Sequence, residues 1–150
     1  MPLNEPLHID ALYMQYALQE ARQAAEEQEI PIGALVVSQG QILGKAHNEP
    51  RHLNDPTAHA ELLALTAAAQ ALGTPILEGC TLYVTIEPCP MCASALYWAR
   101  LARLVYGAKD AKRGFSLFTP SLLHPRTKVI GGVMEEECRR LMQTFFAGRR

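Results

Sequence analysis

The stretch Thr81-Leu-Tyr-Val-Thr-Ile-Glu-Pro-Cys-Pro-Met-Cys92 contains a strand, a turn and the start of a helix in direct succession. Residues 81–86 are apolar and partly β-branched, which is typical of a buried strand. The helix that follows is expected to run to about Ala99. Unpaired N–H groups and the dipole at a helix start lower the pKa of a thiol. The spacing of Cys89 and Cys92 lets both sulfurs bind one metal ion, so the stretch predicts half of a metal site.

A second motif, His59-Ala60-Glu61, supplies a third ligand. One imidazole and two thiolates leave the fourth tetrahedral position to water, which is the arrangement of a catalytic zinc site. Zinc lowers the pKa of bound water toward about 7, and Glu61 is placed to take that proton as a general acid–base. A structural zinc site, with Cys80 or Cys138 as fourth ligand, is the alternative. It would leave Glu61 without a purpose, so Cys80 and Cys138 are expected to be buried core thiols.

Hydrophobic periodicity and turn residues predict the elements around these motifs. A helix is expected over residues 8–29, with Ile9, Leu12, Tyr16, Ala17, Ala21 and Ala24 on its apolar face. A β-hairpin is expected over residues 32–46, turning at Gln39-Gly40. The next helix is predicted to begin at Asp55-Pro56, where a capping carboxylate precedes a proline, and to end near Leu72. Further expected elements are a strand at 104–106, an edge strand within 128–133 and a helix over 134–147.

The length and composition fit one soluble domain over residues 1–150. The chain has 150 residues, of which 49% are hydrophobic, and that is enough for a core without disulfide staples. We find no apolar run of about 20 residues for a membrane span and no secretory signal at the start. Four cysteines without such a signal favour reduced thiols and a metal site. The cytoplasm is the expected location, with no membrane as a partner.

Charge divides unevenly along the chain although the net charge is −1. Residues 1–99 carry 3 basic and 11 acidic side chains, and residues 100–150 carry 11 basic and 4 acidic ones. The split is consistent with a surface for a polyanion built from the C-terminal third. It is equally consistent with charges that cancel in space against the N-terminal part. Within the basic part, Lys109, Lys112, Arg113 and Arg126 are interpreted as contacts to a phosphate backbone, and the alternative is that they only keep a long loop soluble.

The two motifs together resemble the zinc-dependent cytidine deaminase superfamily. Over nearly its whole length the chain is most similar to the bacterial tRNA-specific adenosine deaminases. The similar segments are residues 31–34, Asn48, residues 55–61, 82–89, 105–110, 131–133 and 136–138, Phe145-Phe146 and Arg149-Arg150. The resemblance implies a three-layer α/β/α fold with a mixed five-stranded sheet. It also implies a homodimer whose subunits share an RNA surface.

The resemblance implies conversion of adenosine to inosine at the wobble position (34) of tRNA, with the anticodon stem-loop as the partner. One Zn²⁺ per subunit would be held by His59, Cys89 and Cys92. Zinc-bound hydroxide would attack the amine-bearing carbon while Glu61 shuttles protons. Asn48 would hydrogen-bond the flipped-out nucleoside, the Ala58 backbone would help to read the base edge, and Asp110 would contact the sugar region of the loop.

Two other functions remain open from the residues alone. A deaminase of a free base or small nucleoside, of the guanine or cytosine type, would use the same zinc motif. A zinc-stabilised binding module would keep zinc but not need Glu61. The loop at 113–126 departs from the family pattern, so its contacts with RNA do not follow from the resemblance. Its Phe115 and Phe118 are interpreted either as stacking platforms for bases or as core residues. Tyr97 and Trp98 are interpreted as core or as a subunit interface.

Overall fold

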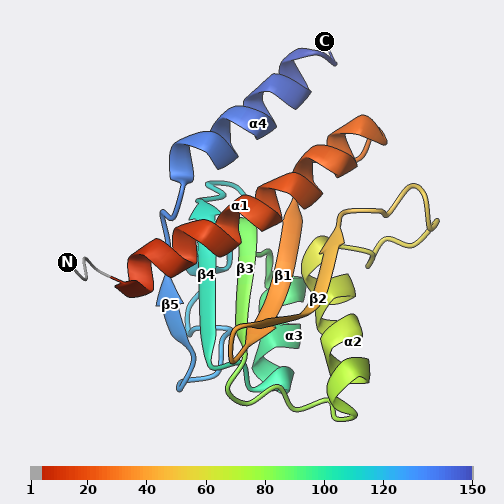
Figure 1. Ribbon diagram of the computed structural model, residues 1–150. Helices are drawn as coiled ribbons and strands as arrows, with labels where there is room; N and C mark the ends of the chain where they lie inside the picture. The colour runs from red at the N-terminus through yellow and green to blue at the C-terminus, as the bar shows by residue number, and fades with distance from the viewer. Residues whose placement is uncertain (1–4, 150) are drawn as a thin grey trace.

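The computed structural model describes residues 5–149 and builds one five-stranded sheet with helices on both faces (Figure 1). The sheet order is β2-β1-β3-β4-β5. β1 pairs antiparallel with β2 and β3, whereas β3, β4 and β5 are parallel. The elements are α1 (Glu5–Glu26), β1 (Gly33–Ser38), β2 (Gln41–His47), α2 (Ala60–Leu72), β3 (Thr81–Ile86), α3 (Pro90–Ala99), β4 (Arg103–Ala108), a 3₁₀ turn (Phe115–Leu117), β5 (Lys128–Ile130) and α4 (Glu135–Ala147). The predicted mixed α/β/α fold is confirmed.

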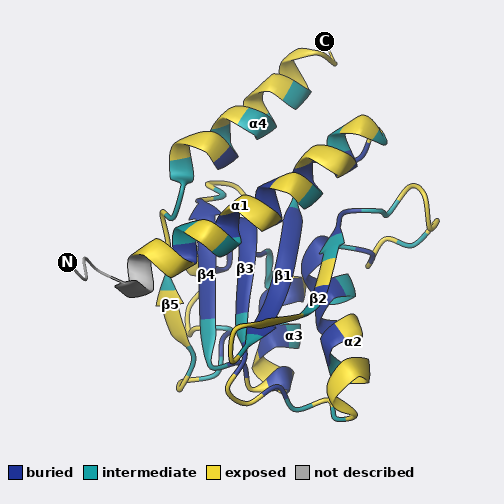
Figure 2. Ribbon diagram, in the orientation of Figure 1, coloured by how far each residue is buried: buried dark blue, intermediate teal, exposed yellow. Residues whose placement is uncertain are grey.

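Two hydrophobic clusters, one on each face of the sheet, form the core. On one face α2 and α3 pack through small side chains such as Ala64, Ala68 and Ala93, which lets the helices approach the sheet closely. On the other face α1 lies across β1, β3 and β4, and α4 covers the far end of β4 (Figure 1). The central strands β1, β3 and β4 are buried almost throughout (Figure 2). None of the described helices is long and apolar enough to span a membrane.

The first helix differs from its prediction in its end and in the face that it buries. It ends at Glu26 rather than 29. Ile9, Leu12 and Tyr16, predicted to be buried, are 43–47% exposed, and Met14 and Leu18 are buried instead. The reason lies in β1: Gly33 touches the helix backbone so closely that any Cβ there would collide with Ala17 and Ala21. That contact rotates the stripe of small residues toward the sheet and turns Ile9, Leu12 and Tyr16 outward.

The second helix begins at Ala60, later than the predicted start at Asp55-Pro56. The Asp55 carboxylate does accept local hydrogen bonds, from the N–H of Thr57 at 2.8 Å and from its hydroxyl at 2.7 Å. These bonds close a turn within the loop instead of capping a helix. The end of α2 is as predicted, because Gly73 adopts the left-handed conformation after Leu72. Because α2 starts at Ala60, His59 is the residue directly before the helix and not a residue of its first turns.

Candidate active site

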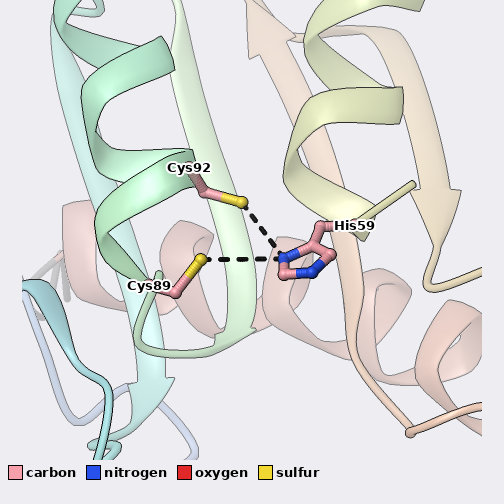
Figure 3. Close-up of side chains that lie close together, drawn as sticks. All are labelled: His59, Cys89 and Cys92. Atoms are coloured by element: carbon pink, nitrogen blue, oxygen red, sulfur yellow. Dashed lines mark hydrogen bonds between the residues drawn. The ribbon is translucent and has the colours of Figure 1, made fainter. Parts of the chain in front are cut away.

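The starts of two helices lie close together at the end of the sheet where β3 ends. His59 is the N-cap residue of α2, and Cys89 is the N-cap residue of α3, followed by Pro90 at the first helical position. Cys92 lies in the first turn of α3. Because β3 runs directly into α3, the motif at 88–92 is carried to this edge by a buried strand (Figure 1). The three side chains point toward one another from the two helices (Figure 3).

The spacing of the three donor atoms fits one zinc ion. His59 Nδ1 lies 3.7 Å from Cys89 Sγ and 3.4 Å from Cys92 Sγ. All three atoms lie within 4.8 Å of one another. In a tetrahedral site with Zn–S near 2.3 Å and Zn–N near 2.1 Å, two ligand atoms are about 3.6 Å apart. The structure thus brings together the three predicted ligands, and they leave one tetrahedral position open.

The predicted fourth-ligand candidates lie elsewhere. Cys80 and Cys138 are buried free thiols, and neither belongs to a group of described residues that could hold a metal ion. Burial raises the pKa of both thiols, to about 12 for Cys138. Neither sulfur joins the donor group of His59, Cys89 and Cys92, so neither is a fourth ligand. Their prediction as core residues is confirmed.

The thiols of Cys89 and Cys92 differ in acidity. The hydrogen bond from Cys92 lowers the pKa of Cys89 to about 4, against the opposing effect of burial. The same bond raises the pKa of Cys92, and burial adds to the rise. The lowered pKa of Cys89 agrees with the expectation of an acidic thiol at this helix start. A cation bound among the donors would favour the thiolate at both positions.

Glu61 is buried beside His59, Cys89 and Cys92, and one of its carboxylate oxygens is not hydrogen-bonded to any described residue. The residue is 3% exposed, and its Oε1 has no hydrogen-bond partner among the described residues. Burial raises its pKa to about 7, mainly because a carboxylate loses hydration there. An unpaired buried carboxylate oxygen is costly unless a partner fills the space next to it. A water on a metal held by His59, Cys89 and Cys92 would be such a partner, so the residues present fit a zinc ion.

The three residues predicted to bind substrate all lie in segments joined to this site. Asn48 is buried, and its Oδ1 accepts a hydrogen bond from the Ala60 N–H at 2.9 Å, which leaves its amide NH₂ to donate elsewhere. The Ala58 N–H donates to Asp55 O at 3.1 Å, and the Ala58 carbonyl accepts from Glu49. One oxygen of Asp110 accepts from the N–H groups of Lys112 and Arg113, each at 3.0 Å. Their predicted contacts with RNA remain predictions.

Glu87 is a residue of this site that sequence reasoning did not single out. Its carboxylate is 3% exposed and accepts hydrogen bonds from Asp110 N at 3.1 Å, Ser116 N at 2.9 Å and Ser116 Oγ at 2.6 Å. Gly114 passes so close that a Cβ there would lie 2.4 Å from the Glu87 carboxyl carbon. Glu87 thus ties the segment after β4 to the Pro88-Cys89 turn. A charged residue at the end of a buried apolar strand is the signal that could have revealed it.

Two aromatic residues of the 113–126 loop differ in how far they are buried. Phe115 is 7% exposed and packs edge-on against Tyr106, so it belongs to the core. Phe118 is 42% exposed. On α3, Tyr97 and Trp98 are exposed, at 40% and 75%, so neither is a core residue in the single chain. The core interpretation holds for Phe115 and is wrong for Tyr97 and Trp98.

Known proteins share both the motif and the fold. The model of the cytidine and deoxycytidylate deaminase zinc-binding region matches residues 7–108. A tRNA-specific adenosine deaminase of Bacillus subtilis (strain 168) is 46% identical over 142 residues, covering 91% of this chain and 88% of its own length. A structure from a study of A-to-I editing by tRNA:A34 deaminases at the wobble position of transfer RNA is 43% identical, with a TM-score of 0.81, over 85% of this chain and 96% of that one.

A guanine deaminase of Bacillus subtilis is also similar, but over less of the chain. Its structure is 39% identical with a TM-score of 0.63, and the match covers 65% of this chain and 63% of that one. A similar fold is therefore found in proteins named for different activities. The match to the zinc-binding region spans both helix starts that form the site. By that match and by its near-full-length relatives, the chain belongs to the cytidine and deoxycytidylate deaminase family.

Proposed function

We propose that the protein is a zinc-dependent deaminase that converts adenosine at the wobble position of tRNA to inosine. The observation that supports the chemistry is the open three-donor group beside the buried, unpaired oxygen of Glu61. The substrate is supported by the relatives named as tRNA-specific adenosine deaminases, which match this chain over most of both lengths.

In the proposed reaction, water adds its oxygen to C6 of adenosine, the C6–N bond breaks and ammonia leaves. His59, Cys89 and Cys92 would hold a zinc ion, which would acidify the water when bound. Glu61 relays the two protons of the water, one to N1 of the purine ring and one to the departing nitrogen, so the carboxylate returns to its starting state.

The proposed positions of the substrate follow from the links around the two helix starts. The amide nitrogen of Asn48 donates to the flipped-out nucleoside, while its oxygen stays on Ala60, next to Glu61. The Ala58 carbonyl, which precedes His59, has a lone pair for the base edge. The second oxygen of Asp110 contacts the sugar region, and Glu87 holds that residue beside Pro88-Cys89. These roles explain why Asn48 and Asp110 each use only part of their hydrogen-bonding capacity inside the protein.

A cleft beside the 109–113 segment supports RNA over a free base. It has a volume of about 480 Å³ and lies between that segment, α4 and the residues before β1. Its lining includes the apolar side chains of Ile30, Met142 and Phe146 and the cations Lys109, Lys112 and Arg113. Apolar side chains suit splayed bases and cations suit phosphates, which is how single-stranded RNA is bound. A free base carries no phosphate, so it would not bind these cations.

We propose that the protein acts as a homodimer in the cytoplasm and that residues 1–150 form one deaminase domain. The exposed Tyr97 and Trp98, in edge-to-face contact on α3, support a subunit interface there, because aromatic residues of this size are enriched in such contacts. Both hydrophobic clusters share the same sheet, which supports a single domain. The cytoplasm is where a tRNA substrate is found.

The experiment is incubation of the zinc-loaded protein with tRNAs that carry A34, followed by sequencing for inosine. We expect conversion at position 34 only, and no conversion by the Glu61→Ala variant at unchanged zinc content. A binding module would keep zinc and RNA binding in both proteins and convert nothing. The alternative, supported by the similarity to guanine deaminase, is a deaminase of a free base. Ammonia release from guanine or cytosine, without conversion of any A34 tRNA, would favour that alternative.

A further inference from the structure

Two groups of cations from residues 100–150 lie at opposite ends of the sheet. The first follows the end of β4, beside the candidate active site, and consists of Lys109, Lys112 and Arg113. The second surrounds the starts of β4 and β5 and consists of Arg100, Arg126 and Lys128. Nothing in the zinc site or its substrate residues accounts for the second group.

The second group lines a recess of about 760 Å³, which we call the basic recess. Arg100 comes from the end of α3, Arg126 from the preceding loop, and Lys128 from the first position of β5. Arg103, at the start of β4, is the register partner of Lys128 and completes the lining. Glu78 is the one acidic residue in the lining.

Three of the four cations lack a counter-charge. The Arg103 guanidinium is held by the buried Asp10, with Nη2 at 2.8 Å from Oδ2, so its charge is compensated. Arg100, Arg126 and Lys128 are exposed, and none forms an ion pair with the described side chains of residues 8–149. The chain as a whole carries a net charge of −1, so this excess is local. Like charges around a concave surface focus a positive potential that attracts an anion.

The recess is built for an extended anion rather than for a small one. Its unpaired cations come from two separate segments, the end of α3 and residues 126–128, and none of the polar side chains that line it is buried. A tight site for a small anion would instead have buried polar groups converging on one point. A nucleic-acid backbone repeats its phosphates along a line, and it can meet several separate cations at once.

We propose that the basic recess binds phosphates in the stem of the anticodon arm, outside the loop that carries the reacting base. This inference rests on the proposed tRNA substrate. β4 spans six residues from Arg103 to Ala108, about 17 Å at about 3.3 Å per residue. At its far end Ala108 O accepts a hydrogen bond from Glu87 N, next to the zinc motif. An RNA that delivers its loop to that end has a stem long enough to reach the recess, and residues 109–127 connect the two ends.

The test compares a recess variant with a charge-matched control. Arg126→Gln with Lys128→Gln removes two recess charges, and Arg100→Gln is added in a triple variant. The control is Arg22→Gln with Lys45→Gln, two exposed cations on α1 and β2, outside the recess. Binding is measured against salt concentration for full-length A34 tRNA and for a hairpin whose stem is cut to about two base pairs. Inorganic phosphate is titrated separately.

For full-length tRNA we expect the double variant to bind roughly tenfold more weakly than wild type at moderate salt. Its plot of log K against log salt should be less steep by about 2, one unit for each lost phosphate contact. The triple variant should lose about one further unit. Binding of the short hairpin and turnover at saturating tRNA should match wild type, because the recess lies away from the reacting base. The control pair should keep the wild-type slope.

Equal affinity and slope in wild type and recess variants would overturn the proposal, and so would an equal loss in the control pair. Saturable binding of inorganic phosphate that disappears in the recess variants, without any change in tRNA binding, would identify a small-anion site and also overturn it. Conversion of A34 by the wild-type protein is measured in parallel. If wild type converts A34 and the recess variants bind tRNA normally, only the recess proposal fails. If wild type converts no A34, the proposed function fails.

Discussion

The carboxylate of Glu87 accepts a hydrogen bond from the Ser116 hydroxyl at 2.6 Å, across 29 positions of the chain. The bond joins the turn that carries Cys89 to the segment that carries Asp110. Since Glu87 also accepts from the N–H groups of Asp110 and Ser116, one buried carboxylate orders both. The metal motif and the segment proposed to contact the substrate are therefore held in a fixed relation by a residue that has neither role.

We predict that Glu87→Gln weakens tRNA binding more than it weakens zinc binding. Glutamine has one acceptor oxygen, and its NH₂ group would face N–H donors that have lost their partner. Leaving such buried donors unpaired costs about 1–3 kcal/mol of folding stability. Denaturant unfolding, zinc content and KM for A34 tRNA are the measurements. Zinc content should stay at the wild-type level while KM rises.

Ser116→Ala is the matched control, because it removes the 2.6 Å bond but leaves the backbone N–H bond in place. It should cost about 1 kcal/mol and raise KM less than Glu87→Gln does. A Glu87→Gln protein with wild-type KM would show that the 110–116 segment is ordered without this carboxylate.

We predict that Glu61→Gln lowers kcat by a factor of about 10² to 10⁴, the usual contribution of a general acid–base. The amide has nearly the same shape as the carboxyl group but cannot take up a proton. Zinc content and KM should remain close to wild type, since Glu61 lies outside the donor group. Single-turnover deamination with metal analysis on the same sample measures this. Zinc loss in Glu61→Gln would mean that the carboxylate is a metal ligand.

Local sequence patterns predict those elements whose conformation is determined by residues close by in the chain. The hairpin turn at Gln39-Gly40 has positive φ at both residues, which Gly and polar residues favour, and it lies where predicted. The strand at 81–86 and the helix after Cys89 also follow from periodicity and from a proline at the first helical position. The three predicted zinc ligands lie close together because each lies at the start of a helix, and the two sequence motifs predict both of these helix starts.

Other features depend on contacts between distant segments. The start of α2 was predicted too early, because the N–H of Ala60 is capped by Asn48, which lies 12 positions earlier and outside any local capping pattern. The close contact with Gly33 of β1 determines which face of α1 is exposed, and the sequence of the helix does not. Glu87 and the basic recess were missed for the same reason. Their partners come together only when β4 and β5 take their places in the sheet.

We predict that replacing His59, Cys89 or Cys92 by alanine removes zinc and activity together. Each residue supplies one of three donor atoms, so the remaining two cannot hold a catalytic ion firmly. Cys80→Ala and Cys138→Ala are the matched controls: they should keep one zinc per subunit and lose only about 1 kcal/mol of stability for the buried sulfur. Metal analysis after gel filtration gives the result. Zinc loss in either control would overturn the open three-ligand site.

We predict that His47 makes the stability of the protein fall as the pH rises above about 6.5. Burial on its own lowers the pKa of His47, but hydrogen bonds to Glu27 at 3.0 Å and Glu20 at 3.3 Å, with the nearby Glu49, raise it overall. The imidazolium is therefore favoured in the folded protein, and it joins α1 to the end of β2. A raised pKa means that the folded state binds the proton more tightly than the unfolded state does.

The stabilisation is therefore complete below the unfolded pKa, near 6.5, and is lost as the pH rises through the higher pKa of the folded state. Unfolding by denaturant at pH 5.5, 7 and 8.5 measures it. His47→Gln should flatten this pH dependence, whereas His8→Gln, at an exposed position of α1, should preserve it. An equal slope in the wild-type and His47→Gln proteins would assign the pH dependence to other groups. Because His47 directly precedes Asn48, the same change tests whether anchoring β2 to α1 also positions the side chain that caps α2 at Ala60.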